Sequence, residues 1–201
     1  MPTLTRLLHA LADLTANEPA APAQATAMGL RAAAPTRDFP AQPASTLTPG
    51  LRAALQLPNA LPLCRLIKKA QALLPWADSP AASLQPTSLT AIKSIAELMG
   101  PDGPIPDPDL RFGLFYQVPH SYYPLHAHRA AETYTLLAGL ARWQAGDARL
   151  TLRPGNAIHH PPERPHAMHA GPDGFVAIWR WSGDIGFESY RMLPDPEAHH
   201  P

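Results

Sequence analysis

The sequence lacks three features that would place it in common classes of protein. Its single cysteine, Cys64, excludes a disulfide framework within the chain, and the apolar run around it predicts a buried structural thiol. Sixteen Lys and Arg residues balance sixteen Asp and Glu residues, so no basic field favours nucleic acid or an anionic membrane as a partner. No apolar stretch reaches the ~18 residues of a membrane span, and the N-terminus lacks the order of a signal peptide. We therefore expect a soluble, cytoplasmic protein.

Proline, in contrast, is abundant, with 26 residues, many of them before residue 110. Because proline breaks helices internally, this region is expected to hold short helices joined by rigid turns. Leucines at positions 4, 7, 8, 11 and 14 recur at helical spacing and predict an amphipathic helix over residues 3–16. A loose connector with one helical turn around 25–33 is predicted over 17–46, followed by helices at 49–57, 61–74 and 88–99.

The pattern changes after Leu110. Short runs rich in aromatic and β-branched residues are separated by turn signals such as Ala138-Gly139 and Pro154-Gly155, and they predict strands at 110–118, 133–138, 141–145 and 175–181. Strands and turns that alternate every eight to twelve residues or so are typical of an antiparallel sandwich or small barrel. We therefore divide the chain into a helical, Pro- and Ala-rich region (1–105) that packs on the barrel, a β-barrel (106–193) and a flexible tail (194–201).

One segment concentrates side chains that bind metals. His126, His128, Glu132 and Tyr134 all have even numbers, so two extended pieces joined by a short bend would point all four into one interior. Two imidazoles and a carboxylate that converge in this way suit a divalent transition metal. A third imidazole comes from His166, on a separate strand after a proline turn. The donor set does not identify the metal, since it suits zinc, iron, manganese, cobalt and nickel alike.

A second group of candidate residues lies on the last predicted strand. Trp179 and Trp181 share one face of it, and Arg180 between them points away, to solvent or to the helical region. Such an aromatic wall either holds a sulfonium or another cation through its ring quadrupoles or simply packs in the core. His159 and His160, before the proline turn, have opposite parity, so at most one of them faces the interior.

The spacing of the candidate ligands resembles the cupin superfamily. The first cupin motif, His-x-His-x3-Glu-x6-Gly, is met by His126, His128, Glu132 and Gly139. The second motif is met in part, by Gly155, Pro161 and His166. The departures are Glu163 for a glycine, Ala170 for an asparagine, and His120 where the first motif opens with glycine.

This resemblance implies a fold as well as a site. The expected fold is mainly β, a cupin barrel (a double-stranded β-helix, or jelly roll) with an N-terminal helical extension. The expected site holds one divalent transition metal on His126, His128, Glu132 and His166. A degenerate cupin that binds no metal is the alternative.

Within the superfamily, the chain resembles the cupin-type dimethylsulfoniopropionate lyases. The likeness rests on Tyr123 before the ligands, Tyr134 two residues beyond Glu132, the helical extension and the Trp-rich final strand. It implies a β-elimination, in which a base removes the proton α to the substrate carboxylate and the C–S bond breaks to give dimethyl sulfide and acrylate. By this resemblance Tyr134 is the catalytic tyrosine, Tyr123 assists it, and Trp179 and Trp181 are candidate substrate-binding residues. An interior tyrosine that only packs is the alternative for Tyr134.

Two other functions stay open beside this carbon–sulfur lyase. A cupin dioxygenase would use iron and oxygen on a small diketone or thiol, and a non-enzymatic sensor would bind metal in the barrel and contact a partner through the helical region. Fold likeness cannot decide among them, because cupins carry many chemistries on one barrel. For the lyase we expect a small-molecule substrate as partner, no nucleic acid and no membrane, with a homodimer among the open oligomeric states.

Overall fold

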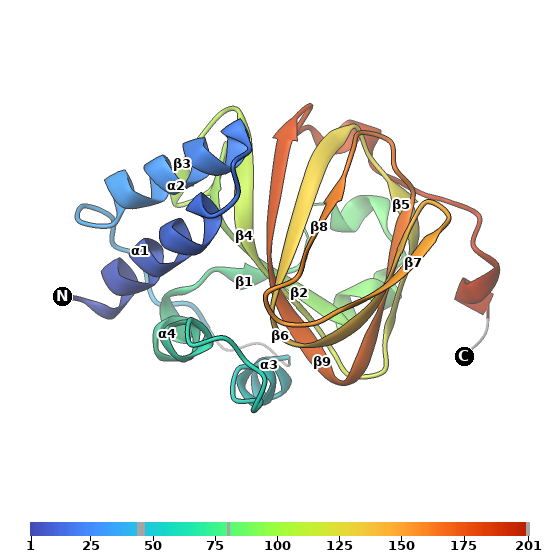
Figure 1. The fold of residues 1–201 in the computed structure, drawn as a ribbon, viewed down its shortest axis with the longest axis horizontal. Helices are drawn as coiled ribbons and strands as arrows, with labels where there is room; N and C mark the ends of the chain where they lie inside the picture. The colour runs from blue at the N-terminus through green and yellow to red at the C-terminus, as the bar shows by residue number, and fades with distance from the viewer. Residues whose placement is uncertain (44–46, 80, 200–201) are drawn as a thin grey trace.

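The computed structural model of the chain describes residues 1–43, 47–79 and 81–199. It is a curled β-structure with helices gathered on one side (Figure 1). The helices are α1 (Thr3–Ala16), α2 (Ala21–Ala33), α3 (Thr48–Ala54) and α4 (Cys64–Ala70). The strands are β1 (Trp76–Ala77), β2 (Lys93–Gly100), β3 (Ile105–Pro106), β4 (Leu110–Gln117), β5 (Tyr122–Ala127), β6 (Ala130–Ala145), β7 (Ala148–Leu152), β8 (Ala157–His160), β9 (His166–Gly183) and β10 (Arg191–Met192). The predicted mainly β fold with N-terminal helices is confirmed.

Two long strands, β6 and β9, organise the barrel because each runs through both of its sheets. The second half of β9 pairs with β4, from Phe175 to Ser182, while its first half pairs with β5 around His166 to His169. In the same way, the first half of β6 pairs with β8 and the second half with β7. β6 and β9 also pair with each other along most of their length. These shared strands close the two sheets into a jelly roll.

Glycines bend both long strands where they pass from one sheet to the other. Gly139 in β6 has φ +82° and Gly174 in β9 has φ +70°. A Cβ atom on Gly139 would lie 2.1 Å from the carbonyl oxygen of Gly174, so no other residue fits there. We predicted a turn at Ala138-Gly139 between two separate strands, and this is wrong, because the chain continues through a bulge as one paired strand.

The helices pack on the outer face of the barrel. The predicted helix over 3–16 is confirmed as α1, and Leu7, Leu8 and Leu11 on its apolar face are buried. They join a core cluster with Leu114 of β4 and Ile178 of β9, whose side chains point outward from the barrel. Residues of the opposite parity, such as Phe115 and Trp179, point inward and form a second cluster. The alternation of β4 and β9 thus separates a helix-facing core from the interior of the barrel.

A partly buried ion pair joins the two parts of the molecule. Arg180 of β9 points out of the barrel, as predicted, and its guanidinium lies 2.7 Å from the Glu18 carboxylate just after α1. It also donates to the hydroxyl of Thr133 on β6. Cys64, at the start of α4, is buried, and burial raises its pKa to about 12, so the predicted structural thiol is confirmed. No helix in the described ranges is long and apolar enough to cross a membrane.

Two predictions of local structure were wrong. The predicted helix over 88–99 is a 3-10 turn (Thr87–Ala91) followed by β2, whose residues pair with β4. The residues of β2 favour a helix locally, and a non-local pairing partner overrides that preference. The predicted connector over 17–46 contains a full helix, α2, whose Pro22 sits in the first turn, where proline is tolerated. Residues 44–46 of that connector lie outside the described ranges.

The boundaries also differ from those expected. β1, β2 and β3 belong to the barrel sheet, so the sheet begins before residue 106. In the predicted flexible tail, the Asp195 carboxylate accepts hydrogen bonds from the Tyr122 hydroxyl at 2.6 Å and the Leu125 amide at 2.7 Å. This part of the tail is therefore tied to β5, and residues 200–201 lie outside the described ranges.

The shared core predicts that helices and barrel unfold together. Leu8→Ala removes a fully buried side chain from this core, which should lower the free energy of unfolding by ~2–5 kcal/mol. Urea unfolding should show one transition by far-UV circular dichroism and by tryptophan fluorescence, with both midpoints shifted equally. Met28→Ala, at a side chain 70% exposed, is the control and should shift neither. Separate midpoints for the two probes would contradict a common core.

Candidate metal centre and its pocket

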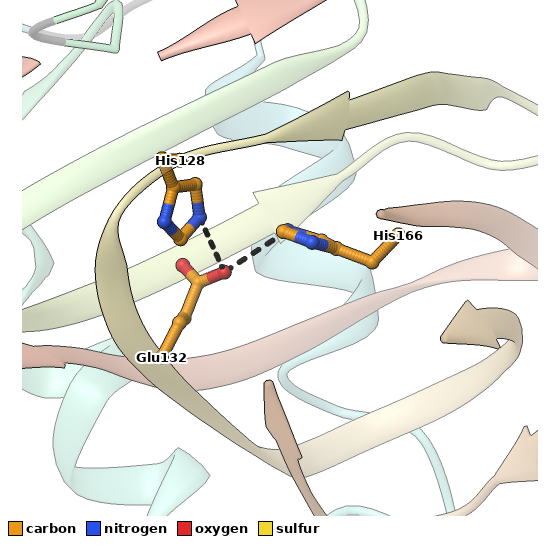
Figure 2. Close-up of side chains that lie close together, drawn as sticks. All are labelled: His128, Glu132 and His166. Carbon is orange, nitrogen blue, oxygen red and sulfur yellow. Dashed lines mark hydrogen bonds and ion pairs between the residues drawn. The ribbon is translucent and has the colours of Figure 1, made fainter. Parts of the chain in front are cut away.

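Glu132 stands at the centre of a buried cluster of histidines (Figure 2). Its Oε2 atom lies 3.2 Å from Nε2 of His128 and 3.1 Å from Nε2 of His166. His128 follows β5, Glu132 is near the start of β6, and His166 opens β9, so three segments meet at one point. The register fixes Glu132 opposite His160 on β8 and opposite Trp181 on β9. One potential ligand atom from each of the three residues lies within 4.8 Å of the others.

The fourth predicted ligand, His126, lies beside this group. Its ring centroid is 4.0 Å from that of His166, and its ring stacks on Tyr123 with centroids 4.3 Å apart. Among the described residues, the atoms that fall within the common 4.8 Å radius come from His128, Glu132 and His166 only. Three of the four predicted ligands thus lie together, and His126 is the one that the geometry places outside the tight group.

Backbone carbonyls orient all three imidazoles. Nδ1 of His126 lies 2.8 Å from the carbonyl oxygen of Pro124, Nδ1 of His128 lies 3.0 Å from that of Ala130, and Nδ1 of His166 lies 2.9 Å from that of Arg164. A carbonyl only accepts, so each Nδ1 carries a proton, which leaves Nε2 as the ring nitrogen available to bind a metal in the neutral ring. This arrangement, in which the second ring nitrogen is fixed by a carbonyl, is typical of metal-binding histidines.

The charges of the cluster fit a cation. Burial lowers the pKa of His126 well below its usual value, and the neighbouring His166 lowers it further. Burial alone would raise the pKa of Glu132, but hydrogen bonds and charge from His128 and His166 outweigh it and hold that pKa well below the ordinary value. An ionised carboxylate thus faces two imidazoles, and Nε2 of His166, 3.1 Å from Oε2 of Glu132, is buried without a well-aligned hydrogen bond in the described part of the chain. A divalent cation satisfies all these acceptors at once, so the residues fit a metal.

The two tryptophans of β9 have different partners. Nε1 of Trp181 donates to Oε1 of Glu132 at 2.7 Å, which leaves Oε2 facing the histidines. Nε1 of Trp179 is buried and finds no acceptor among the described residues. Both rings line the cavity beside the cluster. Trp181 therefore supports a candidate ligand, whereas Trp179 keeps a free donor at the wall of the cavity.

The two predicted tyrosines line the same cavity. Tyr134 is buried, and its pKa is raised well above the usual value by burial and by the negative charge of Glu132. The hydroxyl of Tyr123 lies 2.8 Å from that of Tyr190 and accepts a hydrogen bond from Nε2 of Gln85 at 2.9 Å. Burial and Tyr190 likewise raise the pKa of Tyr123. Both phenols are protonated in this arrangement of charges.

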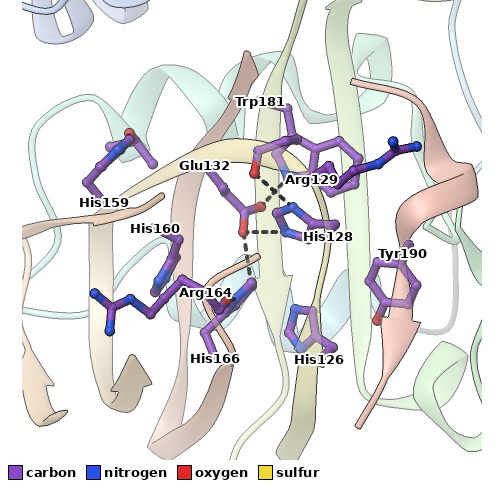
Figure 3. Close-up of polar contacts among 12 residues, drawn as sticks. His126, His128, Arg129, Glu132, His159, His160, Arg164, His166, Trp181 and Tyr190 are labelled. Atoms are coloured by element: carbon purple, nitrogen blue, oxygen red, sulfur yellow. Dashed lines mark hydrogen bonds and ion pairs between the residues drawn. The ribbon is translucent and has the colours of Figure 1, made fainter. Parts of the chain in front are cut away.

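Sequence reasoning missed two residues of the site. His160 is the inward-facing member of its pair, whereas His159 points away (Figure 3). The His160 ring stacks on His166 with centroids 4.2 Å apart, and Nε2 of His160 accepts a hydrogen bond from the indole of Trp143. Burial lowers the pKa of His160 to about 3, with a further contribution from His166. Tyr190 follows a short 3-10 turn after β9, and no motif in the sequence marked it.

The backbone supports the motif alignment where the residues depart from it. Gly139 and Gly155, at motif glycines, have φ +82° and +87°. His120 and Glu163, which replace motif glycines, also have positive φ, +57° and +66°. Non-glycine residues adopt this conformation at a cost in strain, so the barrel keeps its turn geometry even where glycine is absent.

The cavity itself is small. Its volume is about 30 Å³, and besides His126, His128, Glu132, the tyrosines and the tryptophans it is lined by Ser79, Ala81, Ile95, Phe115 and Phe187. A space of this size holds one or two waters. A small organic molecule therefore enters only when some of these side chains move.

Fold and site together define a cupin barrel with a candidate metal centre. A family model for dimethylsulfoniopropionate lyase (DMSP lyase) matches residues 23–177. The DMSP lyase DddQ of Ruegeria pomeroyi is 36% identical over 102 residues, which cover 50% of this chain and 50% of the relative. The chain thus spans about half the length of this curated relative.

Solved structures agree with the family match over most of the chain. A chain from the crystal structures of the DMSP lyases RdDddP and RnDddQII has a TM-score of 0.70 at 27% identity, covering 96% of this chain and 98% of that one. The crystal structure of DddQ from Ruegeria pomeroyi DSS-3 has a TM-score of 0.68 at 26% identity, covering 92% and 93%. The chain belongs to the DMSP lyase family.

The geometry of the cluster predicts which substitutions reduce the amount of bound metal. His128→Ala and His166→Ala each remove a donor that faces Glu132, so purified variants should hold much less metal than the wild type. Elemental analysis of protein loaded with each divalent metal in turn gives the stoichiometry. His159→Ala is the control, because its side chain is exposed and bonds Thr133 on the far side of β6. Full occupancy in both variants would rule out these ligands.

Trp181 offers a graded test of the same site. Trp181→Phe keeps a ring but removes the donor to Glu132, and losing such a supporting bond weakens metal binding by ~10–100-fold. A competition titration against a chelator measures the change. Trp179→Phe is the matched control on the same strand face, and its metal affinity should equal that of the wild type, since the Trp179 indole has no partner in the described cluster.

Proposed function

We propose that this protein is a metal-dependent DMSP lyase, a carbon–sulfur lyase that releases dimethyl sulfide and acrylate by β-elimination. One observation carries the proposal. In a chain of the DMSP lyase family, the candidate ligands His126, His128 and Glu132 line one cavity together with Tyr123 and Tyr134. Two relatives of similar structure are named as DMSP lyases, which supports the same activity here.

The metal is proposed to bind to His126, His128, Glu132 and His166. The tight group of three supplies two imidazoles and a carboxylate, and His126 completes the set from the adjacent strand. Zinc, iron, manganese, cobalt and nickel all suit these donors. A cation held by these residues would supply Lewis-acid chemistry, drawing charge from the substrate carboxylate and so making the neighbouring C–H bond more acidic.

Tyr134 is the proposed base. It accepts the proton from the carbon next to the carboxylate, the electron pair of that C–H bond forms the double bond, and the C–S bond breaks. The sulfur leaves with its electron pair as neutral dimethyl sulfide, and acrylate remains. Because Glu132 and burial raise the pKa of Tyr134, its phenolate forms only when positive charge offsets that carboxylate. Tyr123, fixed through Gln85 and Tyr190, is proposed to orient the substrate beside it.

Both tryptophans are proposed to contact the substrate, with different contributions to its affinity. Trp179 presents a ring and an unpartnered N–H at the cavity wall, which can face the sulfonium and donate to an oxygen of the substrate. Trp181 also lines the cavity, but its N–H is committed to Glu132. We therefore expect Trp179 to contribute more to substrate affinity and Trp181 more to the metal.

An anaerobic assay tests the proposed activity against its rivals. An elimination consumes no oxygen, so metal-loaded protein should release dimethyl sulfide from DMSP, measured in the headspace, with an equal amount of acrylate in solution. Oxygen uptake on a small diketone or thiol, with no acrylate from DMSP under any metal loading, would identify a dioxygenase instead. Full metal occupancy without turnover of either kind would favour a sensor.

Tyr134→Phe tests the base. The variant keeps the ring and its packing but removes the proton acceptor, so kcat should fall by ~10²-fold or more. Metal content and melting temperature should stay near those of the wild type, because the phenol is not a proposed ligand. The rise of rate with pH that reports ionisation of the base should disappear in the same variant.

Tyr123→Phe is the comparison. It should lower the rate less than Tyr134→Phe does, because Tyr123 is proposed to orient and not to accept the proton, and its pH profile should keep the wild-type shape. A variant Tyr134→Phe with near-normal turnover would move the role of base to Tyr123 or to bound hydroxide.

A further inference from the structure

Lys93, the first residue of β2, is buried to an unusual degree for a lysine. Its side chain is 2% exposed, and no carboxylate of the described residues lies within ion-pair distance of its Nζ atom. Burial lowers its pKa to about 8, and the more distant Asp78 offsets this only in part. An ammonium removed from water without a paired anion destabilises a fold, so an apolar residue of the same length would suit this position better. A costly feature of this kind is typical of a functional site.

The partner of this ammonium is Tyr123. Nζ of Lys93 lies 4.9 Å from the centroid of the Tyr123 ring, within the range of a cation–π contact. The same ring stacks on the imidazole of His126 with an interplanar angle of 12°. At its other end, the phenol oxygen is held by Gln85 and Tyr190. Tyr123 is therefore fixed both along its ring and at its hydroxyl.

Lys93 acts on the site indirectly. It is absent from the residues that line the cavity, whereas Tyr123 is among them. Lys93 and Gln85 both precede the β4–β9 core of the barrel, and the chain between Asp78 and Lys93 also supplies Ser79 and Ala81 to the cavity wall. One stretch of chain thus forms part of the wall and carries two groups that hold Tyr123.

We propose that Lys93 is a positioning residue for the elimination, whose ammonium holds the Tyr123 ring in place against His126 and the cavity. The inference rests on the proposed DMSP lyase function. A displaced Tyr123 would leave metal and base intact but misalign the substrate, and small misplacements in an active site cost large factors in rate. A lysine that merely filled space would be replaceable by any side chain of its length.

Lys93→Met keeps the length of the side chain and removes its charge. We expect kcat for DMSP to fall by ~10-fold or more, with a smaller change in KM, because alignment of bound substrate is what is lost. The melting temperature should stay equal or rise, since a buried charge is gone, and metal content should not change. Lys93→Arg keeps a cation over the ring and should restore most of kcat. Lys69→Met, at an exposed lysine of α4, is the control and should behave as the wild type.

Unchanged kcat in Lys93→Met would overturn the proposal. A folded Lys93→Arg variant that loses as much kcat as Lys93→Met would also overturn it, because the charge would then be irrelevant.

A second measurement is independent of activity. In protein labelled with 13C at lysine Cε, the Lys93 signal should be shifted upfield of Lys68 and Lys69 by the Tyr123 ring, and Tyr123→Leu should abolish that shift. If wild-type protein releases no dimethyl sulfide, the proposed function fails, while the signal still decides whether Lys93 lies on Tyr123.

Discussion

The buried carboxylate of Glu132 is the constraint on which the rest of the site depends. Its Oε1 atom accepts the hydrogen bond of the Trp181 indole, so Oε2 faces the Nε2 atoms of His128 and His166. Backbone carbonyls hold the opposite ring nitrogens and prevent the imidazoles from turning away. Acceptors that converge in a buried space repel one another unless a cation or a proton lies among them. The pairing of β6 with β8 and β9 keeps these acceptors close together, and the metal that we propose would remove the repulsion between them.

The same carboxylate affects the two tyrosines of the cavity differently. Tyr134 lies close enough to Glu132 for its pKa to be raised by that charge, so its basicity depends on what offsets the carboxylate. Tyr123 is surrounded instead by groups that fix its position: Lys93 at the ring, and Gln85 and Tyr190 at the hydroxyl. Glu132 thus acts strongly on Tyr134, whereas it is the smallest of several causes that raise the pKa of Tyr123, which is held in place by its neighbours. This difference gives a physical basis for a base and an orienting partner, and neither role could be assigned from spacing alone.

The features predicted correctly are those that depend on residues close together in the sequence. The leucine repeat of α1, the parity of His126, His128 and Glu132, and the outward direction of Arg180 all follow from helix or strand periodicity, and the structure reproduces these directions. The wrong assignments share a different cause. Residues 93–100 favour a helix by composition and become β2 because β4 offers a partner far along the sequence. Gly139 has the signature of a turn and serves as a bend within β6, because a close contact with Gly174 permits only glycine. Long-range pairing of this kind leaves no trace in a short window of sequence.

Residues that no sequence motif marked also contribute to the site. Tyr190 comes from the chain after β9, and Gln85 and Lys93 come from the chain before β4, so both flanks of the barrel converge on Tyr123. Phe187, on the later flank, packs on Trp181 and under the guanidinium of Arg111, which in turn is paired with Glu97 of β2. The cavity that results holds only one or two waters. The groups that hold Tyr123 and part of the cavity wall thus lie on the same two segments, one before β4 and one after β9.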